Sequence, residues 1–378
     1  MTERIFHSTT VVLPSGPARE AWVVLDGERI SSVLEGASAA DLGGVPVEEL
    51  GDRLLAPGFV DQHVHGGGGG AFADGTDGAA AALVAHRAAG TTTSMASLVT
   101  DTIDSLEQQI CALVPLVRAG DLAGIHLEGP WLAEARCGAH EPELLCDPHR
   151  EDLERLLAAG EGTVRMVTLA PERDGALEAI RLLADRDVIA AIGHTDAADA
   201  VIAQALDAGA SVATHLFNGM PSIHHRTPGP IPRLLTDPRV SVELIADGVH
   251  IQPAVLRMAI EASAGPWLLI TDAMAAAAAP DGAYRLGPLD VDVVDSVARI
   301  RSTGAIAGST LTLDRAVRFA IQEVGIDPAD AVRAASQTPA DLLGRPDLGR
   351  IQAGARADLV VLGDDRTVER VIRGGVDL

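Results

Sequence analysis

The sequence predicts an α/β fold: a (β/α)8 barrel of the TIM type, with a small β-sandwich domain built from both chain ends. Two observations support this prediction. From residue 57 to residue 349, short apolar runs alternate with Ala/Leu-rich segments whose apolar residues recur every three or four positions, as in parallel strands joined by helices. Residues 1–56 and 350–378 instead hold short alternating runs typical of antiparallel strands. We therefore expect a barrel domain at 57–349 and a sandwich domain at 1–56 plus 350–378.

The sandwich prediction depends on matching patterns at the two ends. Near the N-terminus, residues 9–13 and 21–25 are strand-like, and Asp26-Gly27 marks a turn. Near the C-terminus, residues 357–362 and 368–372 have the same character. Strands from both ends can therefore form one small domain.

The barrel prediction depends on strands and helices in regular alternation. The predicted strands are 124–128, 165–169, 188–194, 211–215, 240–247 and 267–272, and helices are predicted at 79–89, 176–185, 196–208, 254–264 and 313–324. An open, doubly wound sheet is the alternative. No glycine-rich nucleotide-binding motif follows the first strands, so the barrel is favoured.

Composition limits the function and the location. The chain has 378 residues, of which 47% are hydrophobic, enough for a sizeable core, and its formal net charge is −24. Such a charge argues against a nucleic-acid or anionic-membrane partner, because both require a basic face. No apolar run is long enough to span a membrane, and the N-terminus does not resemble a signal peptide. Three widely spaced cysteines suit a reducing compartment, so we expect a cytoplasmic protein.

Metal-binding side chains follow the apolar strands. His63 and His65 are two residues apart, so in a strand both rings point to the same face. Further histidines and carboxylates end later strands: Glu128, His194, His215, His250 and Asp272. Barrel active sites lie at these strand ends, and such ligands suit zinc, iron, manganese or cobalt. The pattern predicts metal-assisted hydrolysis.

Several motifs are similar to those of one known superfamily. Pro57-Gly58-Phe59-Val60-Asp61 resembles the entry into the first barrel strand of the amidohydrolases. More specific segments are 126–131 (HLEGPW), 193–197 (GHTDA), 214–221 (THLFNGMP), 246–250 (ADGVH), 271–273 (TDA) and 307–309 (AGS). Their order and spacing resemble the N-acetylglucosamine-6-phosphate deacetylase family within that superfamily. The resemblance implies removal of the acetyl group from N-acetyl-D-glucosamine 6-phosphate, giving D-glucosamine 6-phosphate and acetate.

The resemblance also implies a metal centre with one or two divalent ions per subunit. Glu128, His194 and His215 would hold the ion common to the family. His63 and His65, with Glu128 as a bridge and Asp272 nearby, would create a second position. Zinc is the first expectation, with iron, manganese or cobalt as alternatives. Asp272 would take a proton from the water bound to the metal and later give it to the leaving amine.

Substrate contacts follow from the same resemblance. Ala139 and His140 lie in a loop whose histidine would stabilise the developing oxyanion. Asn218, Gly219 and Arg226 would bind the phosphate, with Arg226 reaching across from the neighbouring subunit of a homodimer. The remaining predicted contacts to the sugar phosphate are Asp247, His250, Ile306, Ala307 and Gly308.

Three alternatives can be weighed against this interpretation, each by one feature of the sequence. Dihydroorotase-like and hydantoinase-like amidohydrolases bridge two metals with a carboxylated lysine, and this sequence has no lysine. A deacylase of N-acyl amino acids would keep the metal ligands but would not need Asn218 and Arg226. A sugar-phosphate-binding protein without activity would lack the acid/base residue, yet Asp272 is present.

Overall fold

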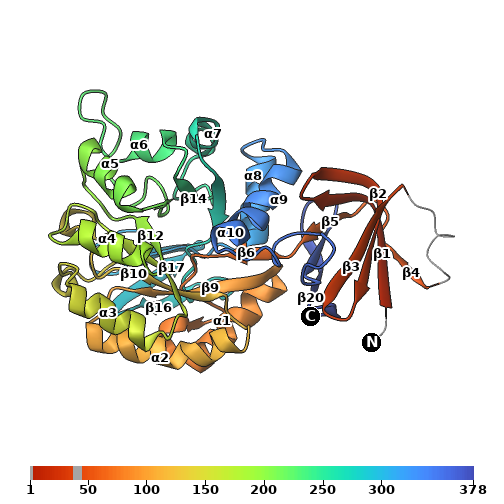
Figure 1. Ribbon diagram of the computed structural model, residues 1–378, viewed down its shortest axis with the longest axis horizontal. Helices are drawn as coiled ribbons and strands as arrows, with labels where there is room; N and C mark the ends of the chain where they lie inside the picture. The colour runs from red at the N-terminus through yellow and green to blue at the C-terminus, as the bar shows by residue number, and fades with distance from the viewer. Residues whose placement is uncertain (1–2, 37–44) are drawn as a thin grey trace. The chain divides into compact units, whose positions relative to one another are not determined.

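The computed structural model describes residues 3–36 and 45–378 (Figure 1). It confirms the predicted fold class: one sheet is an almost closed parallel barrel, and a separate sheet comes from the two chain ends. The chain forms two compact units. One contains Met1–Asp61, His86–Thr93 and Thr312–Leu378, and the other contains Gln62–Ala85 and Ser94–Leu311. The boundaries proposed at 56/57 and 349/350 stay a prediction.

The sheet from the chain ends has eight strands. Its order is β21-β20-β19-β5-β1-β2-β3, with β4 paired to β1. The strands are β1 (Glu3–Leu13), β2 (Gly16–Asp26), β3 (Arg29–Glu35), β4 (Val47–Glu49), β5 (Leu54–Pro57), β19 (Leu359–Leu362), β20 (Val368–Arg373) and β21 (Val376–Asp377). Strand β19 pairs antiparallel with β5, which joins the two ends of the chain in one sheet.

Alternation along β2 gives this sheet an apolar core on each face. Val23 and Leu25 belong to one core cluster, whereas Trp22 and Val24 belong to another. Successive side chains of a strand point to opposite faces, so a run that is apolar throughout can fill two cores.

The barrel sheet has the order β15-β14-β13-β12-β11-β10-β9-β6. Its strands are β6 (Phe59–Asp61), β9 (Thr91–Val99), β10 (Gly124–Glu128), β11 (Val164–Leu169), β12 (Ile189–Ile192), β13 (Val212–Ala213), β14 (Ser241–Ile245) and β15 (Trp267–Ile270). Neighbouring strands from β9 to β15 pair in parallel. A parallel bridge between Val64 and Ala273 joins the first strand segment to the last and closes most of the ring.

Helices follow the barrel strands, as Figure 1 shows. They are α1 (Thr76–Ala88), α2 (Ile103–Arg118), α3 (Arg150–Ala159), α4 (Ala176–Ala184), α5 (Asp199–Ala208), α6 (Ile231–Thr236) and α7 (Pro253–Ala262), and α8 (Leu313–Gln322), α9 (Pro328–Ala334) and α10 (Gln337–Leu342) follow later in the chain. Local chemistry sets several ends. The Thr102 side chain accepts a hydrogen bond from Ser105 N and caps α2, and Gly209 ends α5 with φ 118°.

One substructure was not predicted from the sequence. Strands β16 (Gly282–Leu286), β17 (Leu289–Val294) and β18 (Val297–Ile300) form a small antiparallel sheet after the last barrel strand. Leu286, Val291 and Ile300 pack in one apolar cluster with Val99 and Ala307. The insertion therefore has its own core next to the strand ends. Within the described residues, no helix is long and apolar enough to cross a membrane.

Candidate active site

Closure of the barrel brings the first and last strands together at the predicted site. The backbone N–H of Asp272 donates to His63 O (2.9 Å), and the N–H of His65 donates to Ala273 O (2.8 Å). Residues about 210 positions apart in the sequence are thus neighbours because the ring closes. Backbone hydrogen bonds between the two ends of the barrel sheet therefore fix the positions of both histidines and of Asp272.

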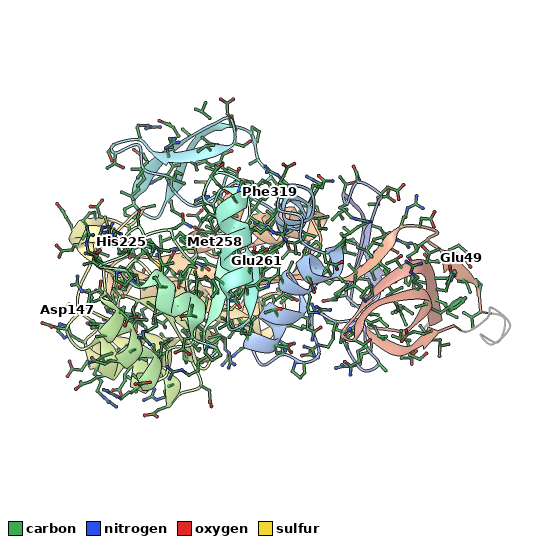
Figure 2. The ribbon with its side chains drawn as sticks, turned by 90° about the horizontal axis from the view of Figure 1, so that it is seen from above. Glu49, Asp147, His225, Met258, Glu261 and Phe319 are labelled. Atoms are coloured by element: carbon green, nitrogen blue, oxygen red, sulfur yellow. The ribbon has the colours of Figure 1, made fainter. Side chains whose placement is uncertain are left out.

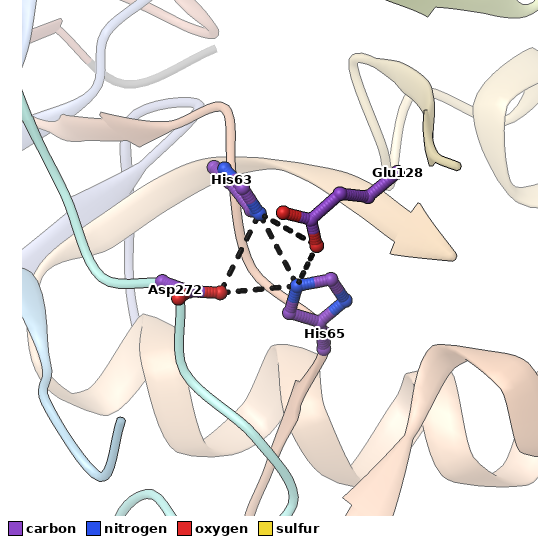
Figure 3. Close-up of side chains that lie close together, drawn as sticks. All are labelled: His63, His65, Glu128 and Asp272. Carbon is purple, nitrogen blue, oxygen red and sulfur yellow. Dashed lines mark hydrogen bonds and ion pairs between the residues drawn. The ribbon is translucent and has the colours of Figure 1, made fainter. Parts of the chain in front are cut away.

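The first group of possible metal ligands contains His63, His65, Glu128 and Asp272 (Figure 3). The Nε2 atoms of the two histidines are 3.2 Å apart. Asp272 Oδ1 lies 3.1 Å from His65 Nε2 and 3.4 Å from His63 Nε2, and Glu128 Oε2 lies at 3.2 Å and 3.4 Å from the same atoms. Four donor atoms therefore converge on one point.

The second group contains Glu128, His194 and His215. The other oxygen of Glu128, Oε1, lies 3.1 Å from His194 Nε2 and 2.9 Å from His215 Nε2. Those two nitrogens are 3.0 Å apart. Glu128 thus offers one oxygen to each group, the arrangement that a carboxylate bridge between two ions requires.

The chemistry of these donors fits a divalent cation. Within each group the ligand atoms lie within 4.8 Å of one another, and all the residues are buried. Nitrogens that face each other at 3.0–3.2 Å are stabilised when a cation lies between them. His194, His215 and Asp272 also have left-handed backbone φ angles of 47°, 27° and 50°. Such strain in non-glycine residues is concentrated at functional sites.

The first group is strongly polarised by its carboxylates. Burial opposes protonation of His65, but hydrogen bonds to Asp272 and Glu128 raise its pKa to about 9. Burial likewise opposes protonation of His63, and the charges of Glu128, Glu243 and Asp272 outweigh it and raise the pKa well above 6.5. Despite burial, the His63 charge holds the pKa of both Glu128 and Asp272 well below the ordinary range. Both carboxylates are therefore ionised at neutral pH, as metal ligands must be.

His140 is a neutral hydrogen-bond donor beside the two groups of possible metal ligands. Burial, together with the nearby His194, lowers its pKa to about 3. Its Nδ1 accepts from the Thr100 backbone N–H (3.3 Å) and lies 2.8 Å from Thr100 Oγ1. Because Nδ1 accepts, the hydrogen is on Nε2, which lies 3.7 Å from Glu128 Oε2. That N–H is available to a substrate oxygen.

A pocket opens over both groups. We call His63 and the pocket residues His65, Glu128, His194, His215 and Asp272 the base of the pocket, and we call Ala139, Asn218, Gly219, His250, Ile306 and Gly308 its rim. His140 also lines the pocket, between base and rim. We also count as rim residues Leu286, the last residue of β16, and Ala305, which follows β18.

Four predicted site residues do not line this pocket. His63 is fully buried behind the other ligands, and Ala307 is buried in the core of the insertion. Asp247 uses one carboxylate oxygen on His250 Nδ1 (2.7 Å) and the other on backbone N–H groups. Arg226 is exposed, with its guanidinium 2.9 Å from His225 Nε2 (His225 is labelled in Figure 2).

Sequence reasoning missed three polar residues that support the base. Glu243 and Gln62 are fully buried beside His63, and Thr100 holds His140. Glu243 had a usable signal, since it is the one charged residue inside the apolar run 240–246. A charge in the middle of a buried strand requires a partner, which is a reason to look for one.

Comparison with known proteins assigns the family. A model of the amidohydrolase family matches residues 54–377, so the chain belongs to the amidohydrolase family. It is 38% identical over 333 residues to an N-acetylgalactosamine-6-phosphate deacetylase of Escherichia coli O157:H7, covering 86% of this chain and 88% of that protein. It is 36% identical over 327 residues to an N-acetylglucosamine-6-phosphate deacetylase of Vibrio furnissii, covering 85% and 82%.

A solved structure matches the whole chain. It is a variant of the N-acetyl-D-glucosamine-6-phosphate deacetylase of Mycobacterium smegmatis in complex with N-acetyl-D-glucosamine-6-phosphate. The TM-score is 0.95 and the identity 48%, over 100% of this chain and 99% of that one. The likeness therefore includes the sheet built from the chain ends as well as the barrel.

Proposed function

We propose that this protein removes the acetyl group from N-acetyl-D-glucosamine 6-phosphate, releasing D-glucosamine 6-phosphate and acetate. The observation that carries the proposal is the complete base of the pocket: two carboxylates and four histidines converge, with His140 beside them. A chain that bound the sugar phosphate without acting on it would not need this arrangement. The 48% identity to the mycobacterial deacetylase over the whole chain supports the same reaction.

We propose two divalent ions per subunit, with zinc as the first candidate. Imidazole and carboxylate ligands suit zinc and also iron, manganese and cobalt. A bound ion would polarise the amide carbonyl and lower the pKa of a nearby water. Glu128 has one oxygen in each group, which supports two neighbouring positions rather than one.

Three residues of the chain would carry out the remaining chemistry. Asp272, ionised and pointing Oδ1 into the first group, accepts a proton from the attacking water. As the new C–O bond forms and the C–N bond breaks, Asp272 passes this proton to the leaving amine nitrogen. His140 donates its Nε2–H to the oxygen that gains negative charge. Glu128 links the two ligand groups, because one of its carboxylate oxygens lies in each.

The phosphate requires positive charge, and the described residues of the pocket offer no permanently charged cation. Among the described residues that line the pocket, none is an arginine, and His250 is the one basic residue of the rim. We propose that Arg226 enters the pocket of a second copy in a homodimer. Of the eight large hydrophobic side chains exposed in the described part of the chain, four lie between residues 223 and 258: Ile223, Val249, Val255 and Met258. Such a concentration in the stretch of sequence that contains Arg226 and His250 supports a partner surface here.

One assay tests the substrate. Acetate release should be fast with N-acetylglucosamine 6-phosphate and slow with N-acetylglucosamine, because the phosphate contacts are lost. Comparable rates on the two sugars would contradict the proposal, and faster release from an N-acyl amino acid would identify the alternative deacylase. The N-acetylgalactosamine epimer must be included, since one relative at 38% identity has that sugar in its name. The same samples should be analysed for zinc, iron, manganese and cobalt.

A further inference from the structure

Glu243 is a buried carboxylate at the centre of the barrel with three hydrogen-bonding partners. It lies on β14, whose five residues are all buried, and its side chain has no exposed surface. Oε1 accepts from the Gln62 side-chain amide (2.8 Å), and Oε2 lies 3.1 Å from His63 Nδ1. Oε2 also accepts from the backbone N–H of His215 (3.2 Å). Burying a charge is costly unless it is hydrogen-bonded, so these three partners indicate that the carboxylate has a specific structural role.

The contact with His63 selects the atom that can bind metal. An ionised carboxylate only accepts hydrogen bonds, so His63 Nδ1 carries the hydrogen that faces Glu243. The ring is thereby turned so that Nε2 faces His65, Glu128 and Asp272, at 3.2–3.4 Å. In metal sites, a carboxylate behind a histidine fixes its orientation and increases its basicity.

The contact with His215 reaches the second group through the backbone. His215 has a φ of 27°, which is strained for a residue with a side chain. Its N–H is bonded to the Glu243 carboxylate, and the next N–H, of Leu216, donates to the Glu243 backbone oxygen (2.9 Å). The Glu243 side chain thus contacts the ring of His63 but only the backbone of His215, and the Leu216–Glu243 main-chain bond does not depend on the carboxylate.

We propose that Glu243 is a positioning residue that orients His63 and thereby determines whether the first group binds a metal ion. The inference rests on the metal centre of the proposed function but not on the identity of the substrate. It predicts that loss of the carboxylate weakens the ion in the His63/His65/Glu128/Asp272 group more than the ion in the Glu128/His194/His215 group.

Two substitutions of Glu243 distinguish its effect on the orientation of His63 from its contribution to packing. Glu243→Leu keeps most of the volume but offers no acceptor to His63. Glu243→Gln can still present an oxygen to His63 and His215. Its new amide group can then donate to Gln62, because the Gln62 Oε1 atom is buried without a hydrogen-bond partner and the Gln62 amide can turn around. The Gln variant should therefore recover most of the metal binding that the Leu variant loses.

The measurement is titration of the metal-free full-length protein with Zn²⁺, together with the visible spectrum after loading with Co²⁺. Wild type and Glu243→Gln should bind two ions. Glu243→Leu should bind the ion of the first group, His63/His65/Glu128/Asp272, about 10- to 100-fold more weakly, and it should lose one component of the cobalt spectrum. The inference would be overturned if the Leu variant bound both ions as tightly as wild type does, or if both ions were weakened by the same factor.

A double-mutant cycle with His63→Ala gives a second, independent outcome. If Glu243 acts through His63, adding Glu243→Leu to His63→Ala should change zinc affinity no further, whereas additive losses would reject the inference. Should the Leu variant fail to fold, Glu243→Asp withdraws the oxygen by one methylene and retains the charge. The same selective loss is then expected, and unchanged zinc binding contradicts it. If the variants bind zinc as expected but the wild-type protein has no deacetylase activity, only the proposed function is rejected.

Discussion

The base of the pocket and its rim differ in how completely this chain supplies them. At the base, the ligands are buried, lie at or just beyond strand ends and have further hydrogen-bonding partners. His65 Nδ1 lies 3.1 Å from Ser97 O and His194 Nδ1 lies 2.8 Å from Arg136 O, so these rings are held from behind. At the rim, loops and the inserted sheet supply neutral or weakly basic groups, and Arg226 points elsewhere.

This difference separates chemistry from recognition. The ligands at the base depend on the closed barrel, so their geometry is fixed by the core of a single chain. Binding of a phosphorylated sugar needs positive charge that the rim provides only through His250. Substitutions at the base should therefore change kcat, whereas those at the rim should change KM.

The largest effect is expected at the base, from Asp272→Asn. An amide cannot take a proton from water and return it to the amine, so kcat should fall by about 10²- to 10⁴-fold with little change in KM. Acetate release under saturating substrate measures this, with the metal content of the variant determined in parallel. Asp185→Asn, at an exposed helix end, is the matched control and should leave kcat unchanged. Normal turnover in Asp272→Asn would remove this residue from the mechanism.

The next effect is expected at the rim, from Arg226→Ala. A charge-assisted phosphate contact contributes about 1.5–3 kcal/mol, so KM for the phosphorylated sugar should rise on the order of 10- to 100-fold. The value of kcat should change little, and N-acetylglucosamine without phosphate should be unaffected. Steady-state kinetics on both sugars, with Arg239→Ala as an exposed control, measures this. An unchanged KM would remove Arg226 from phosphate binding.

Mixed dimers show whether Arg226 acts on its own pocket or on its neighbour's. Asp272→Asn and Arg226→Ala chains should be combined, unfolded and refolded together. If the arginine crosses the interface, the mixed dimer has one pocket with both residues intact and regains low-KM activity. If the arginine serves its own pocket, no pocket in the mixture has both residues, and the low KM does not return.

The contrast between base and rim also explains what the sequence could predict. His63, His65, Glu128, His194, His215 and Asp272 could be found because each lies at or just after the end of an apolar strand, and parallel strand ends meet at one edge of a barrel. The strand 124–128 was predicted with its observed bounds, but several others were predicted too long at their ends: 188–194 is Ile189–Ile192 in the structure. There the backbone turns into strained conformations at His194, which hydrophobicity cannot indicate.

Other parts of the site depend on tertiary contacts without a local pattern. The β16–β18 insertion contributes Leu286 to the pocket, but its alternating residues resemble an ordinary exposed hairpin. Thr100 matters only because His140, 40 residues away, returns to its hydroxyl and N–H. Partners at such separations follow from the packing of loops on the barrel rather than from spacing in the sequence.

A smaller effect is expected from pH at the rim. Burial opposes protonation of His250, but its hydrogen bond to Asp247 raises the His250 pKa above 6.5, while His250 in turn lowers the Asp247 pKa. The raised pKa means that the positive charge persists to a higher pH than on an ordinary histidine and is lost as pH rises through the raised value. KM for the phosphorylated sugar should then rise a few-fold, about fivefold at most, on the alkaline side. His250→Gln should remove this dependence and His224→Gln should retain it; an identical alkaline rise in His250→Gln would assign the titration elsewhere.

The smallest effect is expected where base and rim meet, from Thr100→Val. Valine removes the hydroxyl 2.8 Å from His140 Nδ1, but the backbone N–H of residue 100 still donates to the same atom. The hydrogen therefore stays on Nε2, and only the precision of the ring's orientation is reduced. We expect kcat to fall about two- to threefold, near the lower end of one hydrogen bond's net contribution, with KM unchanged. Thr100→Ser retains the hydroxyl and should match wild type. A loss in Thr100→Val as large as that in His140→Ala would mean that the hydroxyl, rather than the backbone, determines which nitrogen of His140 carries the hydrogen.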